Sequence, residues 1–248
     1  MRLFLHELGA QQRVFWRSRE AALFVFLFPL LLFVLLGSVY SGKIGGVPAA
    51  EKLLAGLIGY GCANTAFAGL AIQLVGRRET GILKRIRATP LPTGTYIAAT
   101  LASTLLVFAI QTVALIVLGR VAFGTPLPKA VGSLAAAVVI GAFAFAALGV
   151  ATAALIRSQE GSSAVVNFIL LPMAFLTGAF GPTRHYPEVL RVIGDVLPLK
   201  YFLDIVDAVY IRSRGIWTEP RALAILGIWA ASGLVVGALK FRWEPRET

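Results

Sequence analysis

The sequence predicts an all-α integral membrane protein with six transmembrane helices, and three observations support this fold class. Of the 248 residues, 58% are hydrophobic and only 14% are charged, whereas about a quarter of the residues in soluble domains are charged. Six long stretches contain no Asp, Glu, Lys, Arg or His. Lysine and arginine residues gather at the ends of these stretches, where membrane proteins carry flanking charges.

Each uncharged stretch is long enough to cross a hydrocarbon layer about 30 Å thick, at about 1.5 Å per helical residue. The stretches are residues 21–39, 53–75, 90–119, 130–156, 161–183 and 222–239. They are apolar all round, whereas membrane β-strands alternate over about 10 residues. The third begins with prolines, so we expect its helix to begin near Tyr96. A six-span domain over residues 21–241 follows, with a cytoplasmic tail at 242–248.

The composition excludes several other classes of protein. The formal net charge is +11, but the basic residues flank apolar stretches, so we expect membrane lipid and not nucleic acid as their partner. The single cysteine, Cys62, excludes a disulfide scaffold. With only His6 and His185 beside it, the chain has too few ligands for a four-cysteine or histidine–cysteine metal site. We therefore expect no metal or cofactor on this chain.

The positions of Lys and Arg predict the orientation in the membrane. Basic residues concentrate in residues 1–20, 76–92 and 240–246. The short loops on the opposite side carry fewer, and the longest segment there mixes basic with acidic residues. The positive-inside rule therefore places both termini in the cytoplasm, and an even number of spans agrees with this placement.

Two cytoplasmic segments are predicted to be short helices. Residues 1–20 place Phe15 and other apolar residues among basic ones, which favours an interfacial helix over a basic tail that only sets the topology. In residues 76–92, Ile82 and Ile86 share one helical face and prolines end the helix. An ordinary positive-inside loop would explain its charges but not its glycine and prolines. The residues singled out here are Arg77, Arg78, Glu79, Gly81, Leu83, Lys84, Arg85 and Arg87.

The outer segment, residues 172–220, is predicted to begin with a broken or re-entrant helix. Backbone breakers at membrane depth are tolerated only where protein or a cavity covers them. Apolar residues then recur at helical spacing on both sides of Pro198, which favours two amphipathic helices in the outer interface over a floppy loop. The breakers are Pro172, Gly178, Gly181 and Pro182; the apolar positions are Val189, Val192, Ile193, Val196, Phe202, Ile205, Val206 and Val209.

Several kinds of chemistry are missing from the sequence. No Asp, Glu, Lys, Arg or His lies inside a predicted span, which argues against an ion- or proton-coupled carrier. The chain has no phosphate-loop motif, so energy for uphill transport would enter through another polypeptide. No nucleophile motif or intramembrane histidine supports hydrolysis. The polar residues Asn64, Gln111 and Asn167 either join helices by hydrogen bonds or line a translocation path.

Residues 77–91 resemble the signature of ABC-2 type exporter permeases, the daunorubicin-exporter-like membrane subunits. The resemblance extends over the whole chain: the arginine-rich N-terminal helix, the six spans, the 171–182 stretch, and Pro198 with Tyr201. It implies that two permeases, identical or homologous, pack together and join two cytoplasmic ATPase subunits that hold ATP and Mg²⁺. The segment from Glu79 to Arg87 would be the coupling helix, with the N-terminal helix as a second contact.

The resemblance also implies alternating access with an outer gate in the broken fifth span, at Pro172, Gly178, Phe180 and Pro182. Because no charged residue lines a predicted path, we expect a hydrophobic or amphiphilic cargo, either a drug-like compound or a lipid. Alternatives are export of a lipid-linked glycan or polysaccharide, an ATP-independent carrier or channel, and a non-transporting membrane anchor. The expected location is a bacterial-type inner or cell membrane.

Overall fold

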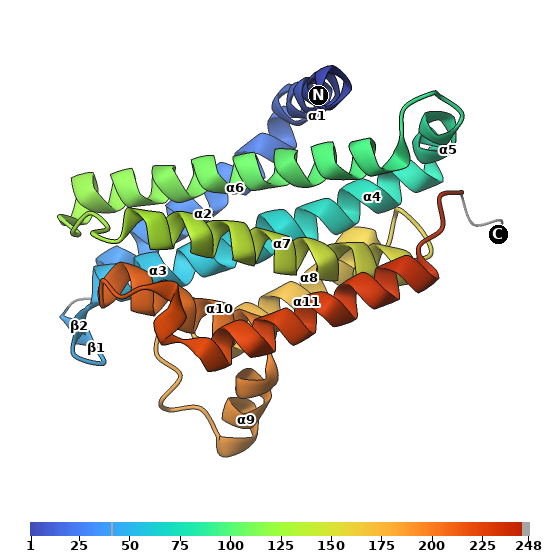
Figure 1. Cartoon of the computed structure of the whole chain (residues 1–248). Coiled ribbons are helices and arrows are strands. Elements are labelled where there is room, and N and C mark those ends of the chain that lie inside the picture. The colour runs from blue at the N-terminus through green and yellow to red at the C-terminus, as the bar shows by residue number, and fades with distance from the viewer. Residues whose placement is uncertain (41, 245–248) are drawn as a thin grey trace.

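Long apolar helices lie side by side along the length of the molecule (Figure 1). The computed structural model describes residues 1–40 and 42–244. Within those residues, five continuous helical stretches are long and apolar enough to cross a membrane, which confirms the predicted all-α membrane class. They are Ala22–Val39, Ala49–Glu79, Thr93–Phe123, Val131–Leu155 and Pro220–Lys240.

The second of these stretches is one continuous helix with a π-helical turn in its middle, made of α3, η1 and α4. The elements in chain order are α1 (Arg2–Arg17), α2 (Arg19–Val39), β1 (Lys43–Ile44), β2 (Val47–Pro48), α3 (Ala49–Cys62), η1 (Ala63–Gly69), α4 (Leu70–Glu79), α5 (Ile82–Arg87), α6 (Thr93–Phe123), α7 (Val131–Leu155), α8 (Ser162–Leu176), α9 (Glu188–Val196), α10 (Pro198–Val206), η2 (Asp207–Ile211), η3 (Ile216–Thr218) and α11 (Pro220–Lys240). Helix α6 begins at Thr93, directly after Pro92, and so one turn earlier than the expected Tyr96.

Helix α8 is shorter than the other membrane helices. Its 15 residues extend about 22 Å, less than the hydrocarbon thickness of about 30 Å. It contains Pro172 and ends at Leu176, and residues 177–180 form turns. The count of six spans therefore stays a prediction.

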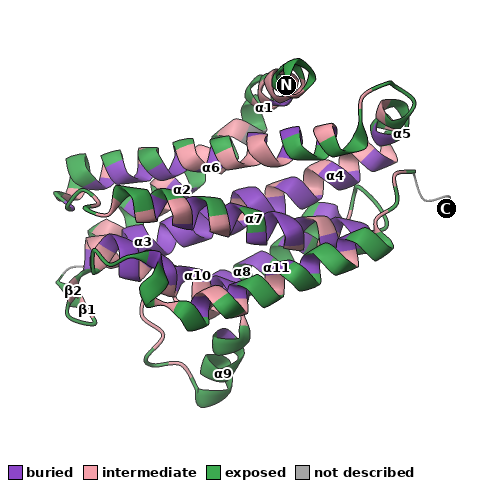
Figure 2. Cartoon of the chain, viewed as in Figure 1, coloured by how far each residue is buried: buried purple, intermediate pink, exposed green. Residues whose placement is uncertain are grey.

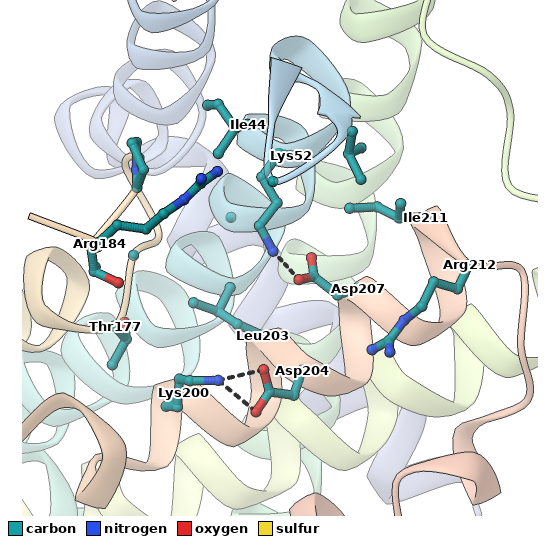
Figure 3. Close-up of a pocket in the computed structure, with 17 residues that line it drawn as sticks. Ile44, Lys52, Thr177, Arg184, Lys200, Leu203, Asp204, Asp207, Ile211 and Arg212 are labelled. Atoms are coloured by element: carbon teal, nitrogen blue, oxygen red, sulfur yellow. Dashed lines mark hydrogen bonds and ion pairs between the residues drawn. The ribbon is translucent and has the colours of Figure 1, made fainter. Parts of the chain in front are cut away.

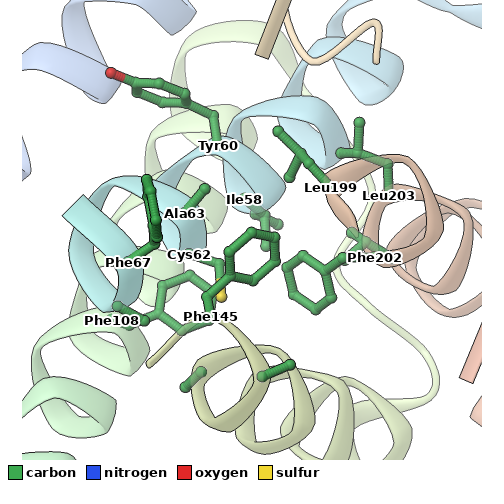
Figure 4. Packing of buried hydrophobic residues seen from close by; sticks show 14 of the residues in the cluster. Ile58, Tyr60, Cys62, Ala63, Phe67, Phe108, Phe145, Leu199, Phe202 and Leu203 are labelled. Carbon is green, nitrogen blue, oxygen red and sulfur yellow. The ribbon is translucent and has the colours of Figure 1, made fainter. Parts of the chain in front are cut away.

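Helices α3 and α7 lie at the centre of the bundle, whereas α2 and α11 expose much of their surface (Figure 2). Phe145 of α7 packs edge-on against Phe202 of α10, with ring centroids 5.9 Å apart (Figure 4). An outer helix that is apolar all round is stable here because lipid covers its exposed face. Phe24 of α2, 73% exposed, is such a lipid-facing side chain.

The two short outer helices differ in where their apolar faces lie. In α9, Val189 and Val192 are exposed, as an interfacial helix requires. In α10, Phe202 and Ile205 are fully buried, so the apolar face of this helix packs on the protein core and not on lipid. The spacing of apolar residues is the same for either environment, and the contacts with α3, α7 and α11 decide between them.

The two ends of the bundle carry different structures. Helix α5 and the end of α11 lie at one end, and a β1–β2 hairpin lies at the other (Figure 1). The hairpin pairs Lys43 with Pro48 and was not predicted. Its two-residue turn, Gly45 and Gly46, has φ of 63° and 86°, the positive values that a type I′ turn requires. Helix α1 crosses α6, and the Gln12 amide donates to Ser103 Oγ at 2.9 Å.

Candidate functional site

The predicted coupling segment is a sharp turn between α4 and α5. The turn contains Gly81, whose φ of 70° lies in the left-handed region that glycine adopts at little cost. Thr80 Oγ1 donates to the Gly76 carbonyl at 2.8 Å and closes the end of α4. The chain therefore leaves the membrane helix and immediately starts a second helix in a new direction.

The side chains of two residues in this segment are buried inside the protein. Arg78 has no exposed surface. Its guanidinium donates to the carbonyls of Ala153 and Ile156 at 3.0 and 2.7 Å, and to Glu79 Oε1 at 2.7 Å. These carbonyls lie at the end of α7, where helix carbonyls lack intrahelical partners. Leu83 is also fully buried. The expectation that these two side chains contact an ATPase is therefore wrong: Arg78 joins α4 to α7, and Leu83 packs α5 onto the membrane helices.

Arg77 joins the coupling segment to two further helices. Its guanidinium donates to the hydroxyl of Tyr96 at 2.7 Å, at the start of α6, and to Gln11 Oε1 at 2.6 Å in α1. Within α5, the exposed residues are Ile82, Lys84, Arg85 and Arg87. The segment thus exposes a basic surface on α5, while Arg77 and Arg78 next to it contact α1, α6 and α7.

The polar residues at membrane depth separate into two groups. Gln111 is fully buried; it accepts from Thr65 Oγ1 at 2.9 Å and donates to the Val25 carbonyl at 2.9 Å. That carbonyl is free because Pro29, four residues later in α2, has no N–H to donate. Gln111 therefore joins α2, η1 and α6 and does not line a path.

Asn64 and Asn167 form the second group. Asn64 of η1 is half-buried and Asn167 of α8 is exposed, on elements that contact each other. Among the described residues, neither amide has a hydrogen-bond partner from another side chain or the backbone. Exposed amides at this depth are costly against lipid, so this face favours contact with a polar path or another subunit.

The predicted outer gate folds back onto α3 after the end of α8. Gly56 of α3 has no Cβ, and an added one would lie 2.2 Å from the carbonyl oxygen of Ala179. Phe180 packs against Tyr60 and Phe175, each with ring centroids 4.9 Å apart. Gly178 has φ of 82°, which permits the turn. Of the four predicted residues, Gly178 and Pro182 also line a cavity beside the β1–β2 hairpin, Phe180 joins an aromatic cluster, and Pro172 lies within α8.

The hairpin end of the bundle also holds charged residues that sequence analysis did not bring together. Lys52 of α3 forms an ion pair with Asp207 of η2, and Lys200 pairs with Asp204 at 2.6 Å (Figure 3). The i, i+4 spacing of Lys200 and Asp204 was a usable signal. Lys52 and Asp207 are 155 residues apart in the sequence, so only the fold shows their contact.

The Asp207 carboxyl is expected to make stability depend on pH. Burial raises its pKa above the ordinary value of 3.8, although Lys52 acts to lower it. The folded chain therefore takes up this proton at a higher pH than the unfolded chain, so the contribution to stability grows as pH falls through the folded-state pKa. From about pH 7 to about pH 4.5, the thermal midpoint of the native chain should rise relative to that of Asp207→Asn, which cannot titrate. A relative fall would contradict the direction.

The fold and these segments define a class of protein: a multi-pass helical membrane subunit of the transporter type. The sequence model of the ABC-2 type transporter family matches residues 3–211, and the chain belongs to this family. Its members are membrane subunits, and the ATP-binding site lies on a separate protein.

Two curated relatives come from Escherichia coli (strain K12). The chain is 24% identical over 182 residues to "Inner membrane transport permease YhhJ", covering 70% of this chain and 48% of the relative. It is 20% identical over 159 residues to "Probable multidrug ABC transporter permease YbhR", covering 63% and 43%. The chain thus spans about half the length of these relatives.

Proposed function

We propose that this chain is the permease subunit of an ATP-driven exporter in a bacterial-type inner or cell membrane, with both termini in the cytoplasm. Two phosphate-loop ATPase subunits bind ATP and Mg²⁺ beneath it, and a second permease, identical or homologous, completes the path. ATP binds two conformations with different affinity and so drives alternating access. Family membership and the printed names of the relatives, a transport permease and a probable multidrug permease, support this proposal.

The observation that carries the proposal is the construction of the coupling segment. Helix α5 exposes Lys84, Arg85 and Arg87, which suit a partner surface that carries acidic groups. Directly before α5, at the end of α4, Arg77 and Arg78 bind to α1, α6 and α7. A displacement of α5 by an ATPase would therefore move several membrane helices together. A loop that only set the topology would not need these buried contacts.

The proposed path lies along the face that carries Asn64 and Asn167. Their amides supply hydrogen bonds to a passing polar group, and Phe168, which follows Asn167 in α8, is 81% exposed. A surface with both characters suits a hydrophobic or amphiphilic cargo, a drug-like compound or a lipid.

Substitution of Gly81 by valine tests the coupling role. A β-branched residue at φ of 70° is strained by about 1–2 kcal/mol, so the direction of α5 should change. Glu79→Ala removes the carboxylate that accepts from Arg78. With the ATPase present, both variants should insert into the membrane normally but lose most of the cargo-stimulated ATP hydrolysis and transport.

Gly94→Val is the matched control, because a Cβ at Gly94 meets no atom within 4 Å and its φ is not in the left-handed region. This variant should retain coupling. Unchanged coupling in Gly81→Val and Glu79→Ala would overturn the assignment of the segment. Transport by the purified chain without any ATPase would instead support an independent carrier.

A further inference from the structure

A cavity of about 310 Å³ lies at the outer end of the molecule. The β1–β2 hairpin, the start of α3, the turns after α8, and α10 with η2 form its walls (Figure 3). The hairpin, which forms one of its walls, lies at the opposite end of the bundle from α5 (Figure 1). Under the orientation in the proposed function, on which this inference rests, the cavity faces the outside of the cell.

Basic side chains outnumber acidic ones in the cavity lining. The ionisable residues that line it are Lys52, Arg184, Lys200, Arg212, Asp204 and Asp207. Both carboxylates are already paired, Asp207 with Lys52 and Asp204 with Lys200. Glu219, which is outside the lining, pairs with Arg212 at 3.1 Å. Arg184 therefore remains as a lining cation with no ion pair or hydrogen bond to any residue that the structure describes.

The Arg184 side chain extends toward Ile44 and Lys52 at the cavity mouth (Figure 3). Its Nη2 would lie 3.7 Å from a Cβ placed on Gly45, so the guanidinium lies over the hairpin turn. A guanidinium in this position has donors free for a planar or tetrahedral oxyanion, which arginine binds in bidentate fashion. The adjacent lysines would add to the positive potential.

The surface next to the cavity is apolar. Phe175, in the last turn of α8, is 52% exposed, and Leu171 one turn earlier is 40% exposed. The chain passes directly from these residues into Gly178 and Pro182 of the cavity wall. An acyl or aromatic tail on α8 would thus place a headgroup in the cavity.

We propose that this cavity binds the anionic headgroup, a phosphate or a carboxylate, of an amphiphile, with Arg184 as its counter-charge. This deepens the proposed function by naming the charge of the cargo on the exit side. The exposed apolar residues of α8 accommodate the tail, and the cations of the cavity hold the head.

The test compares three ligands. The first is an acylglycerol phosphate; the second is the acylglycerol with the same chain, which lacks the phosphate; the third is glycerol phosphate, which lacks the acyl chain. Binding to the full chain in phosphatidylcholine nanodiscs is measured by calorimetry. The acylglycerol phosphate should bind at least about tenfold more tightly than either of the others, and Arg184→Gln should weaken it about tenfold. Arg191→Gln, which removes an exposed arginine of α9 outside the cavity, is the control and should bind as the native chain does.

Equal affinity of the native chain and Arg184→Gln would overturn the site. Equal affinity for glycerol phosphate and the acylglycerol phosphate would overturn the proposal that the ligand is an amphiphile, and would indicate a site for free anions. The measurement needs no ATPase, so its failure would leave the exporter proposal intact. Conversely, a failure of the coupling variants would leave this result unchanged.

Discussion

Replacement of Arg78 by methionine should lower the free energy of unfolding by about 3–5 kcal/mol, the cost of removing one partner from a buried charged network. Three acceptors lose their donor at once: the Ala153 and Ile156 carbonyls and the Glu79 carboxylate. The two carbonyls lie at the end of α7 and are shielded from bulk water, because Arg78, Ala153 and Ile156 are all buried. The measurement is the midpoint of denaturant unfolding in detergent.

Arg87→Met is the matched control, since Arg87 is exposed on α5 and forms no buried contact. It should change stability by less than about 0.5 kcal/mol while weakening attachment to the ATPase. Arg78→Lys should recover little of the lost stability, because the compact lysine ammonium cannot reach all three acceptors as the planar guanidinium does. If Arg78→Met unfolded at the same denaturant concentration as the native chain, the guanidinium would have no structural role.

The membrane class was predictable because it depends on local properties of the sequence. Long uncharged stretches define the helices, and prolines and glycines define their ends. Pro92 precedes α6, and Gly81 separates α4 from α5. The aromatic cluster around Phe180 and the fold-back against Gly56 were not predictable, because they need the distance between segments far apart in the chain.

The roles of the polar residues were harder to predict than the helices. An arginine in a positive-inside loop is normally exposed, so nothing in the sequence distinguishes Arg78 from Arg77 or Arg85. The acceptors of Arg78 are 75 and 78 residues away. The role of Gln111 had a partial signal in the sequence. Pro29 in a membrane helix leaves one carbonyl without its usual N–H donor, and another donor must satisfy that carbonyl. The sequence does not say which donor it is.

Substitution of Gly233 by leucine should separate α11 from α7 and destabilise the chain by about 3 kcal/mol or more. A Cβ at Gly233 would lie 2.8 Å from the carbonyl carbon of Ala147 and 2.9 Å from the nitrogen of Leu148. These are backbone atoms of a central helix, so no side chain can rotate away and the helices themselves must move apart. Small residues at helix crossings serve this close approach in membranes, where packing, not water exclusion, holds helices together.

Gly227→Leu makes the same change six residues earlier in α11, where an added Cβ meets no atom within 4 Å. Both substitutions raise the helix propensity by a similar amount, so the difference between the two variants isolates the contact with α7. Unfolding midpoints in detergent should fall for Gly233→Leu and stay near the native value for Gly227→Leu. Equal midpoints would mean that α11 is free to shift on α7. The rigid attachment through which a push on α4 and α7 would reach the last membrane helix would then be absent.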